Sequence, residues 1–142
     1  MKKLFVPILF IIFFTGCKST MKTAVKPEQL SGEYIVYEIN DIALDNSATD
    51  IPTFTLSAED SYFQGNTGCN SIFGPYELDG SKIKFPNLAV SEKYCPEGNT
   101  MEIERKFVEA LNEVKDYRLH NRVLTLYGKG NNILLRATKT QK

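Results

Sequence analysis

Residues 99–114 read NTMEIERKFVEALNEV, and this stretch decides the fold class because its pattern differs from everything around it. Its apolar residues follow the i, i+4, i+7, i+8, i+11 spacing of an amphipathic helix, at Ile103, Phe107, Ala110, Leu111 and Val114. Asn99 can cap the first turn, with Glu102 in the capping-box position, and Glu102 and Glu104 suit the positive end of the helix dipole. The pattern predicts one helix with one apolar face.

Short strand patterns lie on both sides of this helix. Before it, alternating or β-branched runs occupy residues 33–39, 53–57, 61–64, 73–78 and 82–85. The last two runs are expected to form a hairpin with a type I′ turn at Asp79-Gly80. After the helix, residues 117–119, 122–127 and 133–138 predict a closing meander. We therefore predict an α+β domain, in which a strongly curved, mainly antiparallel sheet of about eight short strands packs against one amphipathic helix.

The first residues of the chain resemble an export signal. Lys2 and Lys3 precede an apolar run of eleven residues, 4–14, which is shorter than the roughly 20 residues that span a bilayer. Residues 14–17 (FTGC) resemble a bacterial lipobox, with Phe14 in place of the usual Leu. We expect cleavage before Cys17 and attachment of fatty acyl chains, such as palmitate, to that cysteine. An ordinary secretory signal with an incidental Cys, or a buried N-terminal helix, is the alternative.

This interpretation divides the chain into a lipoprotein signal peptide at 1–16, a flexible polar tether at 17–30 and a globular domain at 31–142. The membrane is the expected partner, through the N-terminal lipid. Because no Asp follows Cys17, an outer-membrane protein facing the periplasm is expected if the organism is Gram-negative. The mature part carries fifteen basic and seventeen acidic residues, and a net charge near −2 argues against nucleic-acid binding.

A more specific pattern lies in the middle of the chain. Gly68, Cys69, Asn70, Gly74 and Tyr76 form G-C-N-x-x-x-G-x-Y, followed by Cys95, the helix and a Tyr-x-Leu strand. This order and spacing resemble the META domain of HslJ-type heat-shock lipoproteins, although Ser91 stands where that family usually has Thr. The resemblance implies a curved antiparallel sheet with a helix, an envelope location and links to stress or antibiotic tolerance. It implies no established enzymatic activity.

Cys69 and Cys95 are the two cysteines that remain once Cys17 is acylated. An even count in an oxidising compartment favours a disulfide, which would be structural. Two alternatives stay open, namely reduced buried thiols and a redox or metal-binding pair such as a Cu(I) site with Met101.

The other candidate site residues have mainly structural interpretations. Gly68 and its neighbours at 65–67 predict a tight turn rather than a phosphate cradle. Gly74 inside a strand predicts a bulge or a close backbone contact. Asn70 is expected to pin a turn, with ligand recognition as the alternative, and Tyr76 to be a core residue with its hydroxyl at the rim.

Neither a catalytic constellation nor a metal or cofactor site emerges from the sequence. Ser71 and Ser91 lack a nucleophile motif, and His120 is the one histidine. The carboxylate pairs Asp41–Asp45 and Glu102–Glu104 are typical of solvated turns and helix starts.

We therefore expect a monomeric, non-enzymatic envelope lipoprotein that supports stress or antibiotic tolerance through binding an unidentified protein or small molecule. A carrier or sensor of a small apolar ligand or a metal, on a concave sheet face, is the alternative.

Overall fold

The computed structural model describes residues 26–45, 50–96 and 98–141. The described residues form one antiparallel sheet of eleven strands with two α-helices and one 3-10 turn. The helices are α1 (Pro27–Leu30) and α2 (Thr100–Glu113), and the 3-10 turn is η1 (Lys129–Asn131). The strands are β1 (Gly32–Ile39), β2 (Ile42–Ala43), β3 (Thr53–Ser57), β4 (Tyr62–Asn66), β5 (Ser71–Pro75), β6 (Glu77–Asp79), β7 (Lys82–Lys84), β8 (Ala89–Val90), β9 (Asp116–His120), β10 (Val123–Tyr127) and β11 (Ile133–Lys139).

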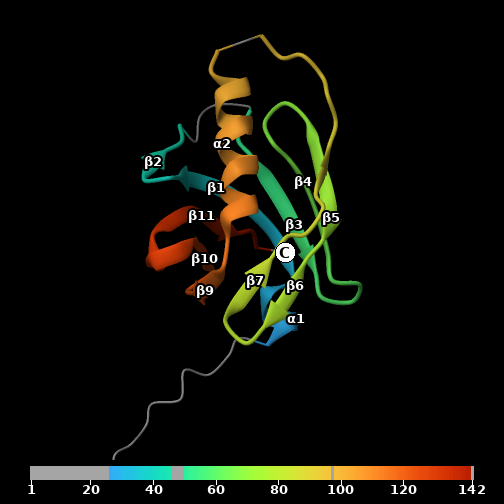
Figure 1. Ribbon diagram of the computed structural model, residues 1–142, viewed down its shortest axis with the longest axis vertical. Helices are drawn as coiled ribbons and strands as arrows, with labels where there is room; N and C mark the ends of the chain where they lie inside the picture. The colour runs from blue at the N-terminus through green and yellow to red at the C-terminus, as the bar shows by residue number, and fades with distance from the viewer. Residues whose placement is uncertain (1–25, 46–49, 97, 142) are drawn as a thin grey trace, which may run out of the picture.

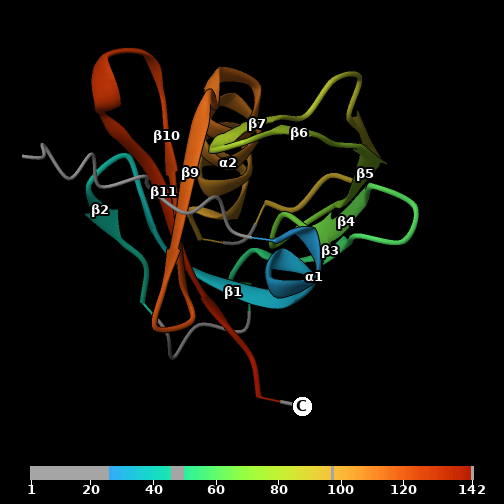
Figure 2. The ribbon, with the colours of Figure 1, turned by 90° about the horizontal axis from the view of Figure 1, so that it is seen from below.

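The strand order explains why the sheet curls. Neighbours run β6-β7-β9-β10-β11-β1-β3-β4-β5-β8, and β2 pairs with β1. Tyr76 alone separates β5 from β6 in the chain, although the two strands lie near opposite ends of this order. The sheet must therefore bend until its two ends approach each other, and Figures 1 and 2 show the resulting half-barrel around α2. The predicted α+β fold with a strongly curved antiparallel sheet is confirmed.

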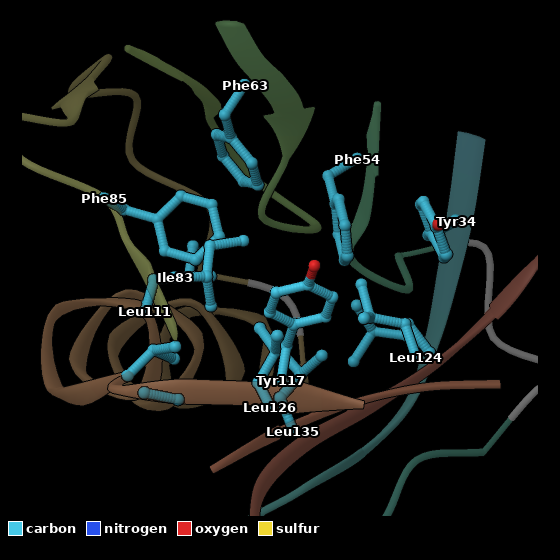
Figure 3. Packing of buried hydrophobic residues seen from close by; sticks show 14 of the residues in the cluster. Tyr34, Phe54, Phe63, Ile83, Phe85, Leu111, Tyr117, Leu124, Leu126 and Leu135 are labelled. Atoms are coloured by element: carbon cyan, nitrogen blue, oxygen red, sulfur yellow. The ribbon is translucent and has the colours of Figure 1, made fainter. Parts of the chain in front are cut away.

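The helix α2 fills the inside of this curl with the face that the sequence predicts. Phe107, Ala110, Leu111 and Val114 are buried, and Ile103 is half-buried. Figure 3 shows Tyr34, Phe54, Phe63 and Phe85 facing a layer of aliphatic side chains. The Phe54 ring lies 5.3 Å from that of Phe63 and 6.4 Å from that of Phe107, between centroids. Aromatic pairs at such separations stabilise a core beyond the area that they bury.

One predicted strand and one predicted turn differ in the structure. The run at 73–78 is divided at Tyr76, so its first half pairs with β4 and β8 and its second half pairs with β7. The β6–β7 hairpin forms as expected, but its loop is Gly80-Ser81 and only Gly80 has a positive φ, of 60°. A type I′ turn needs two such residues, so that prediction is wrong here. Consecutive positive φ angles occur at Asn40-Asp41 and Asn121-Arg122.

The predicted capping of α2 is also wrong. The side chain of Asn99 makes no capping hydrogen bond, and φ −107°, ψ 17° is not the extended conformation that turns an N-cap side chain toward the helix. Glu102 instead forms an ion pair with Lys106, whose Nζ lies 2.8 Å from Oε1. The hydrogen bond and the positive charge of Lys106 lower the pKa of Glu102.

The N-terminal end of the domain begins earlier than the predicted boundary at residue 31. Pro27–Leu30 form the short helix α1, and Leu30 is fully buried. The Tyr34 hydroxyl donates a hydrogen bond to the Leu30 carbonyl at 2.6 Å, and Lys139 Nζ donates to the Gln29 carbonyl at 2.8 Å. The last part of the predicted tether therefore belongs to the domain. The predicted signal peptide and Cys17 lie outside the described residues.

Within residues 26–45, 50–96 and 98–141, neither α-helix is long and apolar enough to cross a membrane.

Candidate functional site

The sequence motif at residues 67–70 forms a turn held by its own backbone and by one hydroxyl. Thr67 N–H donates to the Asn70 carbonyl at 2.8 Å, and Asn70 N–H donates to Thr67 Oγ1 at 2.9 Å. Gly68 has φ +98°, and a Cβ at this position would lie 2.4 Å from the carbonyl oxygen of Asp50. Only glycine fits this backbone, since both the conformation and the space exclude a side chain. A tight turn therefore forms, but it lies at residues 67–70 and not at the predicted 65–68, because Gly65 and Asn66 still belong to β4 and only Gly68 has a positive φ.

The side chain of Asn70 joins three segments of the chain. Its Oδ1 accepts hydrogen bonds from Ser91 Oγ at 2.9 Å and from Lys93 N–H at 2.7 Å. Its Nδ2 donates to the Lys93 carbonyl at 3.2 Å and to both carboxylate oxygens of Glu104, at 3.1 and 2.9 Å. Asn70 is only 2 % exposed, so these partners replace water for its amide. The structural role predicted for Asn70 is what these contacts provide.

Glu104 is the residue of this network that the sequence interpretation misplaced. The sequence pattern favours an interaction of Glu104 with the helix dipole, whereas in the structure its carboxylate accepts hydrogen bonds from Asn70 Nδ2 and from the Thr67 hydroxyl. A signal existed in the sequence, because positions 100, 104, 107 and 111 share one face of the helix. A carboxylate in line with Phe107 and Leu111 requires a buried or half-buried polar partner.

A disulfide between Cys69 and Cys95 reinforces the same junction. The two Cα atoms are 6.0 Å apart, and the bridge joins the turn after β4 to the segment that leads from β8 into α2. Closing a loop over 26 residues stabilises the fold by about 3.5 kcal/mol in the chain-entropy estimate. We call Thr67, Asn70, Ser91, Lys93, Glu104 and this disulfide the clasp. The clasp holds the 91–95 segment and the second turn of α2 against the end of β4.

Gly74 and Tyr76 have structural positions toward the end of β5 that is farther from the clasp. A Cβ on Gly74 would lie 3.0 Å from Leu88 Cδ2 and 3.1 Å from the Asn87 carbonyl oxygen, so this glycine allows the close backbone contact that the sequence predicts. Tyr76 is buried and donates its hydroxyl to the Ser57 carbonyl at 2.9 Å. Burial raises its pKa, with a further contribution from Asp60. The core position and the bonded hydroxyl predicted for Tyr76 are confirmed.

The candidates for metal or nucleophilic chemistry lie apart or are engaged in structural contacts. The thiols of Cys69 and Cys95 are joined in the disulfide, and Met101 is an exposed side chain of α2. Among the described residues, no group of three or more His, Cys, Asp or Glu side chains could hold a metal ion. Ser91 Oγ accepts from Ser71 N–H at 3.1 Å while donating to Asn70. His120 is exposed at the end of β9.

The concave side of the sheet is filled by the apolar core and by α2. One hollow lies beside it. It is a pocket of about 260 Å³ beside the β1–β2 hairpin, with residues of the first turns of α2 on its other side. A shallower hollow of about 380 Å³ lies over β3, β4 and β5 on the outer face, next to the exposed rings of Tyr62 and Phe73.

Comparison with known proteins agrees with this architecture. The model of the META domain family matches residues 26–141. An NMR structure of a protein from Burkholderia xenovorans is similar, with 18% identity and a TM-score of 0.67 over 93% of this chain and 100% of that chain. A second NMR structure has 22% identity and a TM-score of 0.65, and the match covers 81% of this chain and 95% of the other.

A crystal structure of a DUF4847 family protein from Bacteroides vulgatus ATCC 8482 is also similar. It has 18% identity and a TM-score of 0.58, with 80% of this chain and 95% of that chain covered. At these identities the structures show a shared fold. No curated protein matches the chain.

Proposed function

The chain belongs to the META domain family, and from this premise we propose that it is a lipid-anchored protein of the bacterial envelope that acts by binding. The observation that carries the envelope location is the disulfide between Cys69 and Cys95. Disulfides persist in exported proteins and are rare in the reducing cytosol. The bridge therefore supports the same compartment as the export signal predicted at residues 1–16.

The proposed anchor fixes which end of the domain lies near the membrane. Eight residues lie between Cys17 and Lys26, and an extended chain over the resulting nine steps reaches about 30 Å. Figure 1 places α1 at one end of the long axis and the start of α2 at the other. The α1 end would face the bilayer, and the end with the start of α2 would face the periplasm or the medium.

The clasp uses its polar groups within the fold, so the proposed binding role belongs to other surfaces of the domain. The amide of Asn70 and the carboxylate of Glu104 bond to each other and to the chain around them, as a scaffold requires. The resemblance to stress-related lipoproteins adds the expectation that this scaffold supports envelope stress or antibiotic tolerance without catalysis.

A second candidate function, a carrier or sensor of a small apolar molecule, is favoured by the pocket next to the β1–β2 hairpin. Its lining includes Ile39, Ile42 and Leu44. Pockets of this kind, apolar with a few polar groups at the rim, are the usual form of small-molecule sites.

The proposed function is tested in the source bacterium by deleting the gene and restoring either the wild-type chain or Cys17→Ser. The wild-type protein is expected in the membrane fraction and Cys17→Ser in the soluble envelope fraction. Survival under heat or antibiotic challenge should fall on deletion and return with the wild-type chain. Unchanged survival would contradict the stress role, and a wild-type protein in the cytosol would contradict the anchor.

A further inference from the structure

The pocket beside the β1–β2 hairpin has an apolar wall on two sides. Ile39, Ile42 and Leu44 line it from the hairpin, and Ile103 lines it from α2. Ile42 is 50% exposed. Its side chain leaves apolar surface in contact with water at this cavity, so an apolar occupant would gain free energy by covering it.

The rim of this pocket carries an excess of negative charge. Three carboxylates line it, those of Asp45, Asp50 and Glu102, together with one ammonium group, that of Lys106. Lys106 is paired with Glu102 at 2.8 Å. With that pair neutral, Asp50 contributes a full negative charge against roughly half a positive charge from the start of α2 through the helix dipole, so the rim stays negative without any contribution from Asp45. An occupant with a cationic group therefore suits this rim, whereas an anion would meet three carboxylates.

The size of the cavity restricts the occupant further. The cavity has a volume of about 260 Å³. This is below the range of about 300–1,000 Å³ that is usual for drug-sized ligands. A short alkyl chain or a single aromatic ring fits this space.

We propose that this pocket binds a small organic cation, with its apolar body against Ile39, Ile42, Leu44 and Ile103 and its ammonium group at Asp50 and Glu102. The inference rests on the binding role proposed above and assigns that role a place on the domain. The pocket lies at the start of α2, the end of the molecule opposite α1, so the proposed anchor leaves it open to solutes of the surrounding compartment.

The test uses the mature chain, residues 17–142, with Cys17→Ser so that neither acyl chains nor detergent compete for the pocket. The protein is secreted to an oxidising compartment to form its disulfide, labelled with ¹⁵N, and titrated separately with hexylammonium, hexan-1-ol and hexanoate. Hexylammonium should cause saturable amide shifts at Ile42, Leu44 and Ile103. Its affinity should exceed that of hexanol by about tenfold because of the rim charge, and hexanoate should bind more weakly than hexanol.

Two pairs of variants separate the pocket from the rest of the surface. Ala43→Phe, which places a ring at the lining, should abolish binding, whereas Ala89→Phe changes an exposed alanine of another two-residue strand and should not. Asp50→Asn should weaken hexylammonium about fivefold and leave hexanol unchanged. Asp60→Asn, in the exposed turn after β3, is its control.

Absence of saturable shifts in the pocket would overturn the site, and so would binding that survives Ala43→Phe. Equal affinities for the three probes would overturn the cationic ligand class. None of these outcomes bears on the membrane anchor or the stress role, because the fractionation and survival experiments measure those without any ligand.

Discussion

The apolar core and the clasp hold the same helix in different ways. On one side of α2, Phe107, Ala110 and Leu111 are buried among aromatic and aliphatic side chains, where contacts depend on volume and shape. One turn nearer the start of the helix, on the same face, Glu104 is held by directed hydrogen bonds from Asn70 and Thr67, next to a covalent bridge. From this difference we expect the core to tolerate substitutions that keep the side-chain volume. In the clasp, even the exchange of a single atom should lower the stability of the fold.

The largest effect is expected from the core. Phe107→Ala removes a fully buried ring that stacks on Phe54, and should lower the free energy of unfolding by about 4 kcal/mol. Met101→Ala, at an exposed position of the same helix, should change it by less than about 0.5 kcal/mol. Urea denaturation of both variants measures the difference. A loss below about 1.5 kcal/mol for Phe107→Ala would mean that the core does not position α2.

The covalent part of the clasp comes next. Replacing both Cys69 and Cys95 with Ser should cost about 3.5 kcal/mol, mainly because the unfolded chain regains the freedom of the closed loop. The near-ultraviolet circular dichroism of the core aromatics should remain. Loss of that signal under native conditions would show that the core depends on the clasp, and would remove the distinction between the two regions.

The directed part of the clasp is tested by Asn70. Asn70→Ala leaves the Lys93 N–H without its acceptor and the Glu104 carboxylate with the Thr67 hydroxyl but not the Asn70 amide, and it should cost about 2 kcal/mol. Asn112→Ala, on the exposed face of α2, is the control. Unfolding free energies that differ by less than about 0.5 kcal/mol between these variants would contradict the structural role of Asn70.

A substitution of equal volume sharpens the contrast between the regions. Asn70→Asp keeps the size of the side chain but places a second carboxylate against Glu104, and the repulsion should relax as the pH falls below about 5. Leu111→Met, equal in volume within the core, should cost less than about 1.5 kcal/mol and show no such pH dependence. Denaturation at pH 4.5 and at pH 7 compares the two variants.

The smallest effect is expected where the core meets α1. Tyr34→Phe removes one buried hydrogen bond to the Leu30 carbonyl and should cost about 1 kcal/mol at neutral pH. Burial raises the pKa of Tyr34, so the neutral phenol stabilises the fold fully below the unfolded pKa of about 10. Stability should fall as the pH rises above that value, and it should fall less in Tyr34→Phe. Equal slopes above pH 10 would contradict this.

The core could be predicted from the sequence because its signals are periodic. The helix stripe from Ile103 to Val114 and the alternation at residues 53–57 each place apolar residues at a regular spacing. The buried positions follow that spacing. The four-residue helix α1 and the two-residue strands β2 and β8 are too short to contain a period, and no pattern revealed them.

The clasp could be predicted only in part, because it depends on single residues far apart in the chain. The motif pointed to Cys69, Asn70 and Cys95, and their structural interpretation agrees with the contacts. The partnership of Asn70 with Glu104 spans 34 residues and follows from the tertiary fold alone. The division of one predicted strand into two at Tyr76 has a similar cause. It follows from the curl of the sheet, and the local sequence does not indicate it.

The central claim, that an anchored envelope protein carries an oxidised clasp, is tested most directly by intact mass. The protein is extracted from membranes of the source bacterium and alkylated under denaturing conditions, with and without reductant. We expect a chain that begins at acylated Cys17 and gains two alkyl groups only after reduction. An unlipidated mass, or alkylation of Cys69 and Cys95 without reductant, would contradict it.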